Sequence, residues 1–262
     1  MAKISDISNK ATLSVIDQMG RQVDLPHMPS RIISLVPSIT EYLVDLGLED
    51  RLVGRTKFCI RPERVVQTIP AIGGTKKFDF DKISALEPDL IIGNKEENYA
   101  SGIEQLAHSF PVWMSDILNL EHNFEMMESI GTMTGKSVEA ASWIHRVRSN
   151  FRKYYKKYSG RVLYLIWRRP YMVAGRGTFI SHVLEYLGYE NAILQMRYPE
   201  IDPYILQRLK ADQVFLSSEP FPFKQKDIQE FQKIFPGALT RLVDGEAFSW
   251  YGSRLAKVSF DF

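Results

Sequence analysis

The chain has 262 residues, of which 45% are hydrophobic and 24% are charged, and its formal net charge is +2. This composition is typical of a globular protein, and the length exceeds what one hydrophobic core usually supports. A net charge this small argues against nucleic acid as a partner, and no stretch approaches the roughly 20 apolar residues that span a bilayer. The only cysteine, Cys59, excludes an intramolecular disulfide.

The first ten residues, Met1 to Lys10, have no apolar core and no small-residue cleavage site. They therefore do not resemble a secretory signal, and a full-length chain of this sequence is expected in the cytoplasm. Residues 13–25 alternate apolar and polar side chains around a turn at Gln18 to Arg21, which predicts a short β-hairpin. We expect residues 1–30 to be a lead-in that packs on the first lobe.

Residues 31–120 alternate short apolar runs with segments of helical periodicity, which predicts a lobe of parallel strands flanked by helices. The expected strands are 32–36, 52–54, 90–92 and 112–114, and the expected helices are 39–46, 80–86 and 103–108.

Residues 121–158 are predicted to be linking helices, because they contain no proline and their apolar residues recur at helical spacing. The run Gly131 to Gly135 is expected to separate a shorter helix from a longer one between about Ser137 and Lys157. At ~1.5 Å per residue the longer helix would be ~30 Å long, which is enough to bridge two lobes.

Residues 159–262 repeat the scheme of the first lobe. The strand sequence Arg31 to Leu35 returns as Arg161 to Leu165, and Ile83 to Ile92 matches Leu206 to Phe215 in apolar character. The predicted fold is therefore α/β, with two similar lobes of parallel sheet flanked by helices and bridged by one long helix. In open sheets of this kind ligands bind beyond the carboxyl ends of the strands, and a cleft between two lobes is a usual binding site.

Candidate ligand-binding residues follow the predicted strands. Trp167, Arg168 and Tyr171 lie after the first strand of the second lobe, where aromatic rings can stack on a planar ligand while a guanidinium pairs with its carboxylates. The alternative is that the aromatics belong to the core and the arginines to a solvated edge.

In the first lobe, Phe58 and the loop residues Lys76 and Phe78 offer a similar mixture, although a plain surface loop is the alternative. Trp250 and Tyr251 follow the last strand, with Arg254 at the start of a helix. They are expected to form a wall of the site, unless they pack in the core.

Two further features have simple explanations. The segment Asn94 to Tyr99 is interpreted as a solvated charged turn, and the seven basic residues between Arg146 and Arg161 as a solvated helix face, with membrane or nucleic-acid contact as the second interpretation. No two of the five histidines have the short spacing of a metal site, so we predict no protein-bound metal or covalent cofactor.

Several segments together resemble the helical-backbone substrate-binding proteins of ABC importers, nearest the cobalamin-binding branch. They are Arg31 to Leu43, Ile72 to Gly74, Ile83 to Ile92, Tyr198 to Ile201 and Trp250 to Leu255. The resemblance implies a monomer that delivers a corrinoid, haem or ferric siderophore to an ABC permease, and a periplasmic location. It also implies acidic docking residues on each lobe, for which Asp81 and Glu200 are the candidates; alignment places Tyr204 at the second position.

The leading hypothesis is a binding protein, not an enzyme, that holds a metal chelate noncovalently between its lobes. An intracellular chelate-handling enzyme or chaperone, similar to a chelatase, is the second hypothesis. It lacks support from a nucleophile elbow, a phosphate loop or a histidine pair. A pure protein-interaction module is the third.

Overall fold

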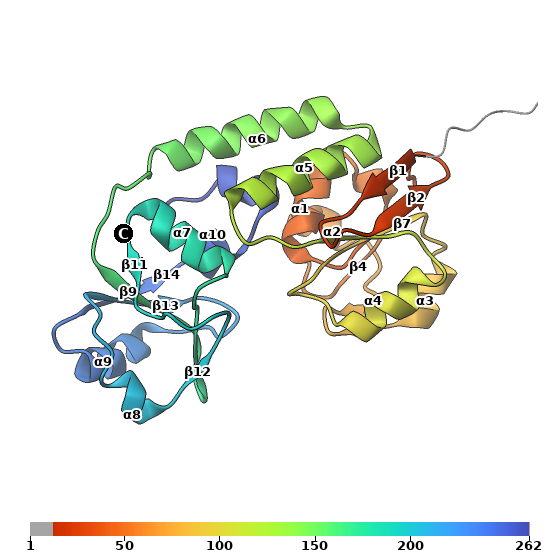
Figure 1. Ribbon diagram of the computed structural model, residues 1–262. Helices are drawn as coiled ribbons and strands as arrows, with labels where there is room; N and C mark the ends of the chain where they lie inside the picture. The colour runs from red at the N-terminus through yellow and green to blue at the C-terminus, as the bar shows by residue number, and fades with distance from the viewer. Residues whose placement is uncertain (1–12, 262) are drawn as a thin grey trace, which may run out of the picture. The chain divides into compact units, whose positions relative to one another are not determined.

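The computed structural model describes residues 13–261, so the prediction made for Met1 to Lys10 lies outside the described residues. The chain divides into two compact units (Figure 1). Unit 1 consists of the residues up to Asp116 together with Met126–Ala141, and unit 2 consists of Ile117–Glu125 and Ser142–Phe262.

The sheet of unit 1 is parallel, as predicted, with the strand order β4-β3-β7-β8. Its strands are β3 (Ile32–Ser34), β4 (Leu52–Arg55), β7 (Leu90–Asn94) and β8 (Val112–Ser115). Every residue of β7 and β8 is buried, which is expected of parallel strands covered on both faces. The helices between β3 and β8 in the chain are α1 (Pro37–Asp45), η1 (Glu49–Arg51), α2 (Glu63–Val66), α3 (Phe80–Ala85) and α4 (Ala100–Ala107).

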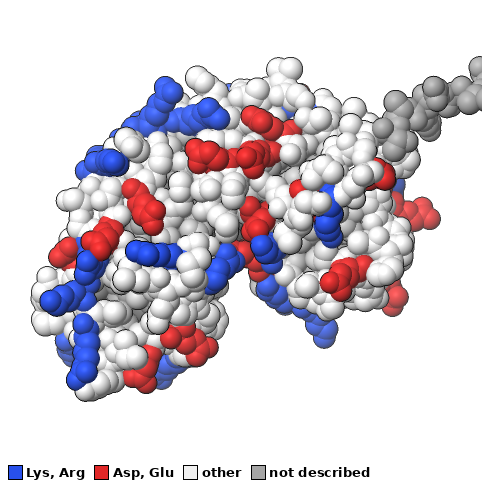
Figure 2. Space-filling view, viewed as in Figure 1, with Lys and Arg blue, Asp and Glu red and all other residues white. Residues whose placement is uncertain are grey.

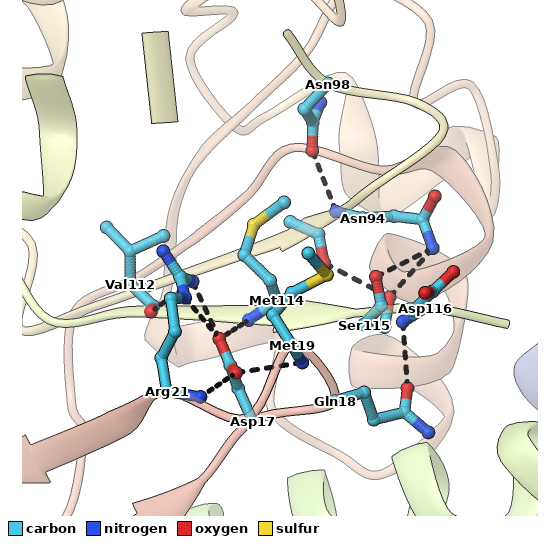
Figure 3. Close-up of polar contacts among 11 residues, drawn as sticks. Asp17, Gln18, Met19, Arg21, Asn94, Asn98, Val112, Met114, Ser115 and Asp116 are labelled. Carbon is cyan, nitrogen blue, oxygen red and sulfur yellow. Dashed lines mark hydrogen bonds and ion pairs between the residues drawn. The ribbon is translucent and has the colours of Figure 1, made fainter. Parts of the chain in front are cut away.

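The amino-terminal hairpin of β1 (Leu13–Ile16) and β2 (Gln22–Leu25) is held to β8 by one buried carboxylate (Figure 3). Asp17 is 4% exposed and accepts hydrogen bonds from the backbone amides of Met19, Arg21 and Met114 at 2.9, 2.8 and 3.3 Å. The guanidinium of Arg21 donates to the same carboxylate at 2.7 and 2.8 Å. The backbone amide of Gln18 adds a bond to the Met114 carbonyl at 3.0 Å.

Two long helices, α5 (Leu120–Thr134) and α6 (Ser137–Arg152), contain the points at which the chain divides into units. Helix α5 continues through Gly131, where a Cβ atom would lie 2.5 Å from that of Ala140, so only glycine allows this close approach. Helix α6 ends five residues before the predicted Lys157. Its regular hydrogen bonding gives way to tighter turns after Arg152, and Lys156 has a φ of 48°.

Unit 2 repeats the central topology of unit 1, because β9, β13 and β14 are parallel and adjacent in the same order as β3, β7 and β8. It differs by an antiparallel strand, β10, next to β9, which the sequence analysis did not predict. The strands are β9 (Arg161–Trp167), β10 (Tyr171–Val173), β11 (Glu190–Asn191), β12 (Glu200–Ile201), β13 (Gln213–Ser217) and β14 (Leu239–Val243).

The helical segments of unit 2 end with a 3-10 helix. They are α7 (Phe179–Leu187), α8 (Pro203–Leu206), α9 (Gln225–Ile234), α10 (Gly245–Ser249) and η2 (Gly252–Ala256). An apolar core packs α9 against the sheet through Leu163, Leu165, Val214, Leu216 and Phe231. Within residues 13–261, no helix is both long enough and apolar enough to cross a bilayer.

Replacing the buried carboxylate tests the anchoring of the hairpin. We expect Asp17→Ala to lower the free energy of unfolding by about 2–3 kcal/mol, because it leaves the buried Met114 amide and two part-buried amides without this acceptor. Urea denaturation measures the loss. The control is Asp24→Ala on the exposed face of the same hairpin, which should change stability by less than about 0.5 kcal/mol. Equal effects of the two substitutions would contradict the anchoring role.

Candidate functional site

A pocket of about 860 Å³ lies at the carboxyl end of β4 in unit 1. One of its sides is a small hairpin of β5 (Gly73–Gly74) and β6 (Lys77–Phe78), a segment that the sequence analysis treated as a loop. Gly73 has a φ of 104°, and a Cβ atom there would lie 2.4 Å from the Lys77 carbonyl oxygen. The backbone amide of Lys57 donates to the Gly73 carbonyl at 2.8 Å and ties the hairpin to the end of β4.

The pocket brings the three candidates of the first lobe, Phe58, Lys76 and Phe78, together. Phe58 is 49% exposed, whereas Phe78 is 6% exposed and packs on Tyr99 with ring centroids 4.8 Å apart. Charged and aromatic side chains share the lining, which is Lys57, Phe58, Gly73, Gly74, Thr75, Lys76, Lys77, Phe78, Asp79, Phe80 and Asp81. Three lysines against two aspartates leave a small positive balance on this wall.

Lys76 has a structural role in the pocket. Its Nζ atom donates to the backbone carbonyls of Glu96 at 2.6 Å and Asn98 at 3.4 Å. These carbonyls belong to the segment after β7, so Lys76 connects the loops that follow two strands of the same sheet. Its ammonium keeps further donor capacity, because a lysine has three N–H groups.

Asn98 connects the same loops through a buried side chain, and the sequence analysis did not identify it. Its side-chain amide donates to the carbonyls of Leu35 at 3.3 Å and Thr75 at 3.2 Å, and its Oδ1 accepts from the Asn94 amide at 2.8 Å. Asn98 is 6% exposed and Asn94 is 1% exposed, so the interpretation of this segment as a solvated turn was wrong for both asparagines. A buried side-chain amide in a turn forms hydrogen bonds with backbone groups that water cannot reach.

The network continues to the neighbouring strand (Figure 3). The side-chain amide of Asn94 donates to Ser115 Oγ at 3.0 Å, and Ser115 Oγ donates to the Gly93 carbonyl at 3.1 Å. The carboxyl ends of β7 and β8 are thus joined by side-chain hydrogen bonds, which makes this edge of the sheet a rigid support.

The candidates around β9 form a second cluster, in unit 2. Trp167 is 38% exposed and its ring lies 5.6 Å from that of Phe221. Arg168 forms ion pairs with Asp227, at 2.6 Å, and with Glu230 of α9.

Tyr171 belongs to the same cluster and donates to Glu230 at 3.4 Å; burial and the nearby carboxylate raise the pKa of its hydroxyl. Arg168 is therefore paired with two carboxylates within unit 2.

Trp250, Tyr251 and Arg254 form a third cluster in unit 2. The two aromatic residues are 8% and 5% exposed, so they pack largely in the interior of the protein. Arg254 lies 5.4 Å from the Trp250 ring centroid and 3.4 Å from a carboxylate oxygen of Glu246. The burial of the two aromatic residues is what the alternative interpretation, packing in the core, expects.

Glu219 is a partly buried acid at the carboxyl end of β13 that the sequence analysis missed. It follows Ser217 and Ser218, and its only signal was a polar run directly after an apolar strand. Its Oε1 accepts a hydrogen bond from Ser249 Oγ at 2.7 Å. Burial raises the pKa of the Glu219 carboxyl group, and the charges of Asp244 and Glu246 act in the same direction.

The two docking candidates, Asp81 in the first turn of α3 and Glu200 in β12, are both exposed. Tyr204, the aligned position in the second lobe, is 61% exposed, with the guanidinium of Arg208 3.9 Å from its ring centroid. Among the described residues, no group of three or more His, Cys, Asp or Glu side chains is placed to hold a metal ion.

Comparisons with known proteins identify the family of the chain. Residues 32–236 match the periplasmic binding protein family, and the chain belongs to that family. A vitamin B12-binding protein of Yersinia pestis is 25% identical over 178 residues, which cover 64% of this chain and 62% of the relative. An uncharacterized ABC transporter substrate-binding lipoprotein of Bacillus subtilis is 26% identical over 149 residues, which cover 55% of this chain and 47% of the relative. The matches thus span less than two thirds of these relatives.

Solved structures share the fold over a larger part of the chain. The periplasmic vitamin B12 binding protein of Vibrio cholerae has a TM-score of 0.75 at 19% identity, covering 88% of this chain and 93% of that one. A periplasmic haem-binding protein of Roseiflexus sp. RS-1 has a TM-score of 0.74 at 19% identity, covering 87% and 94%. Both likenesses confirm the predicted fold class.

The partly buried Glu219 generates a prediction about pH. A carboxyl group whose pKa is higher in the folded than in the unfolded protein costs stability as pH rises, because the unfolded chain releases the proton first. We expect Glu219→Gln to raise the melting temperature at pH 7, and the difference to vanish below about pH 4, where unfolded glutamate is also protonated. Calorimetry across this range measures it.

The matched control is Glu200→Gln, an exposed acid in the same unit, which should leave the pH profile unchanged. A melting temperature for Glu219→Gln that is lower than wild type at pH 7 would mean that the ionised carboxylate stabilises the fold.

Proposed function

We propose that the chain is the solute-binding component of an ABC importer and that it binds a metal chelate noncovalently, either a corrinoid or an iron chelate such as haem or a ferric siderophore. The observation that carries the proposal is the pocket at the carboxyl end of β4, which combines Phe58, Lys76 and Phe80. Membership of the family and the vitamin B12-binding and haem-binding relatives support it.

The pocket chemistry fits a large, flat, partly anionic solute. Its volume of about 860 Å³ lies in the range typical of small-molecule sites, about 300–1,000 Å³. The half-exposed ring of Phe58 offers a face for stacking, and the lysines offer donors to carboxylates or phosphate. The metal is proposed to remain in its chelate, held through the organic part.

In unit 2 we propose Trp167 as the ligand contact and Arg168 as its support. Trp167 ends β9 with an accessible ring, whereas Arg168 is braced by Asp227 and Glu230. An arginine in that position orients the loop after the strand and leaves stacking to the indole. Trp250, Tyr251 and Arg254 are proposed to pack in the interior of unit 2 and so to support the end of β9.

The proposed partner is an ABC permease, which would receive the protein as a monomer on the outer side of the membrane. Asp81 and Glu200 are the proposed docking residues, because both carboxylates are exposed and able to meet permease arginines. Tyr204 and Arg208 would give the second docking surface a mixed aromatic and cationic character.

Titration with a panel of solutes tests the function. We expect cyanocobalamin, haemin or a ferric hydroxamate to quench tryptophan emission and to raise the melting temperature, because a bound ligand stabilises the folded state. Absence of both effects with all three would remove the proposal. Recovery of a modified solute after incubation would instead indicate an enzyme.

Substitution of the stacking ring locates the site. We expect Phe58→Ala to raise the dissociation constant of the bound solute by about tenfold, because it removes one aromatic contact worth roughly 1–1.5 kcal/mol. Isothermal titration calorimetry measures it. Tyr204→Ala, at a more exposed aromatic of unit 2, should bind the solute as wild type does. An unchanged dissociation constant for Phe58→Ala would place the ligand elsewhere.

The shape of the small hairpin gives a second test. Gly73→Ala brings a methyl group 2.4 Å from the Lys77 carbonyl and strains a left-handed residue, so the hairpin must shift. We expect at least a tenfold loss of solute affinity. Gly237→Ala is the matched control, because a Cβ atom there meets nothing within 4 Å. Retained affinity in Gly73→Ala would separate the hairpin from binding.

A further inference from the structure

A basic surface covers the second half of α6 and the turns that follow it. Residues 142–161 contain seven arginines and lysines and no aspartate or glutamate. We call the exposed members of this set the α6 basic surface: Arg146, Arg148, Arg152, Lys153, Lys156 and Lys157. Figure 2 shows the blue side chains gathered at the carboxyl end of α6. All of them belong to unit 2.

The charges lie on one side of the helix because the other side is packed. Val147, Asn150, Phe151 and Tyr154 are buried. Asn150 donates to the carbonyls of Leu255 and Val258 at 3.0 and 2.9 Å and holds this face to the carboxyl-terminal segment. The helix therefore cannot rotate to hide its charges, and the basic side chains are presented together.

Most of these side chains form no ion pair with a carboxylate among residues 13–261. Lys157 pairs with Asp261 at 2.6 Å. In the part of the chain that the structure describes, Arg146, Arg148, Arg152, Lys153 and Lys156 form no ion pair with a carboxylate. Arg146 and Arg148 instead lie over the rings of Trp143 and Phe124, at 4.7 and 4.5 Å. The whole chain carries a net charge of only +2, so this concentration of charge is local.

A small-anion site does not explain the surface. The adjacent pocket, of about 570 Å³, is lined by Lys156 and Arg176 but also by Glu185 and Glu190, so its formal charge is balanced. The excess positive charge lies outside the pocket, on the exposed face of α6 and the turns that follow it. Such a face fits an extended anionic surface better than a single small ion.

We propose that the α6 basic surface binds the anionic phospholipid headgroups of a membrane. Lysines and arginines near such a surface each gain from its negative potential. Tyr155, 57% exposed and flanked by Tyr154 and Lys156, adds an amphipathic ring of the kind that sits at headgroup level. The interaction is peripheral and electrostatic, and it keeps unit 2 at the membrane independently of which solute the protein carries.

The test is vesicle sedimentation of the full chain with phosphatidylcholine vesicles, with and without 30% phosphatidylglycerol. We expect binding only to the vesicles that contain phosphatidylglycerol, and its loss at high salt, because the charges are exposed. Lys153→Glu combined with Lys156→Glu should reduce binding by at least about 25-fold, from roughly fivefold for each lysine.

The matched control reverses two exposed lysines of α9, Lys226→Glu with Lys233→Glu, and should bind vesicles within twofold of wild type. Circular dichroism and melting confirm that both variants fold. Equal loss in the two variants, no preference for phosphatidylglycerol, or tighter binding to duplex DNA at the same phosphate concentration would overturn the proposal. Solute titration of the same variants should match wild type, so failure here is distinct from failure of the proposed carrier function.

Discussion

The architecture of unit 1 depends on satisfying buried polar groups where parallel strands end. Backbone amides and carbonyls that leave a parallel sheet beneath covering loops cannot reach water, and each needs a partner. Asn94, Asn98 and Ser115 provide these partners at the ends of β7 and β8. Because Asn98 also reaches the loop at Thr75, the same bonds hold the hairpin that forms the pocket.

The pocket is therefore supported by the sheet in two ways. The sheet fixes the position of β4, and the backbone bond from Lys57 to Gly73 fixes the hairpin against it. Lys76 then closes the connection to the segment after β7. Rigid support of this kind lowers the ordering cost of the solute binding that is proposed for this pocket.

Unit 2 uses the same topology with different side-chain chemistry. Its central strands repeat the order of unit 1, but the end of β9 carries a paired arginine, and the end of β13 carries the partly buried acid Glu219. The antiparallel strand β10 occupies the edge next to β9. A duplicated fold thus carries different side chains at corresponding strand ends of its two units.

The sequence by itself determined the central parallel strands and their order, because buried strands and amphipathic helices have periodicities that a single chain displays. The repeat of Arg31 to Leu35 in Arg161 to Leu165 predicted the matching strands β3 and β9, and residues after strand ends supplied Phe58, Lys76 and Phe78, which line one pocket. Only the tertiary structure decided the partners of each charge and the burial of each polar group. Arg168 meets acids 59 and 62 residues away, and Asn98 bonds to Leu35 across 63 residues. Such contacts depend on how distant segments pack, and local periodicity contains no information about them.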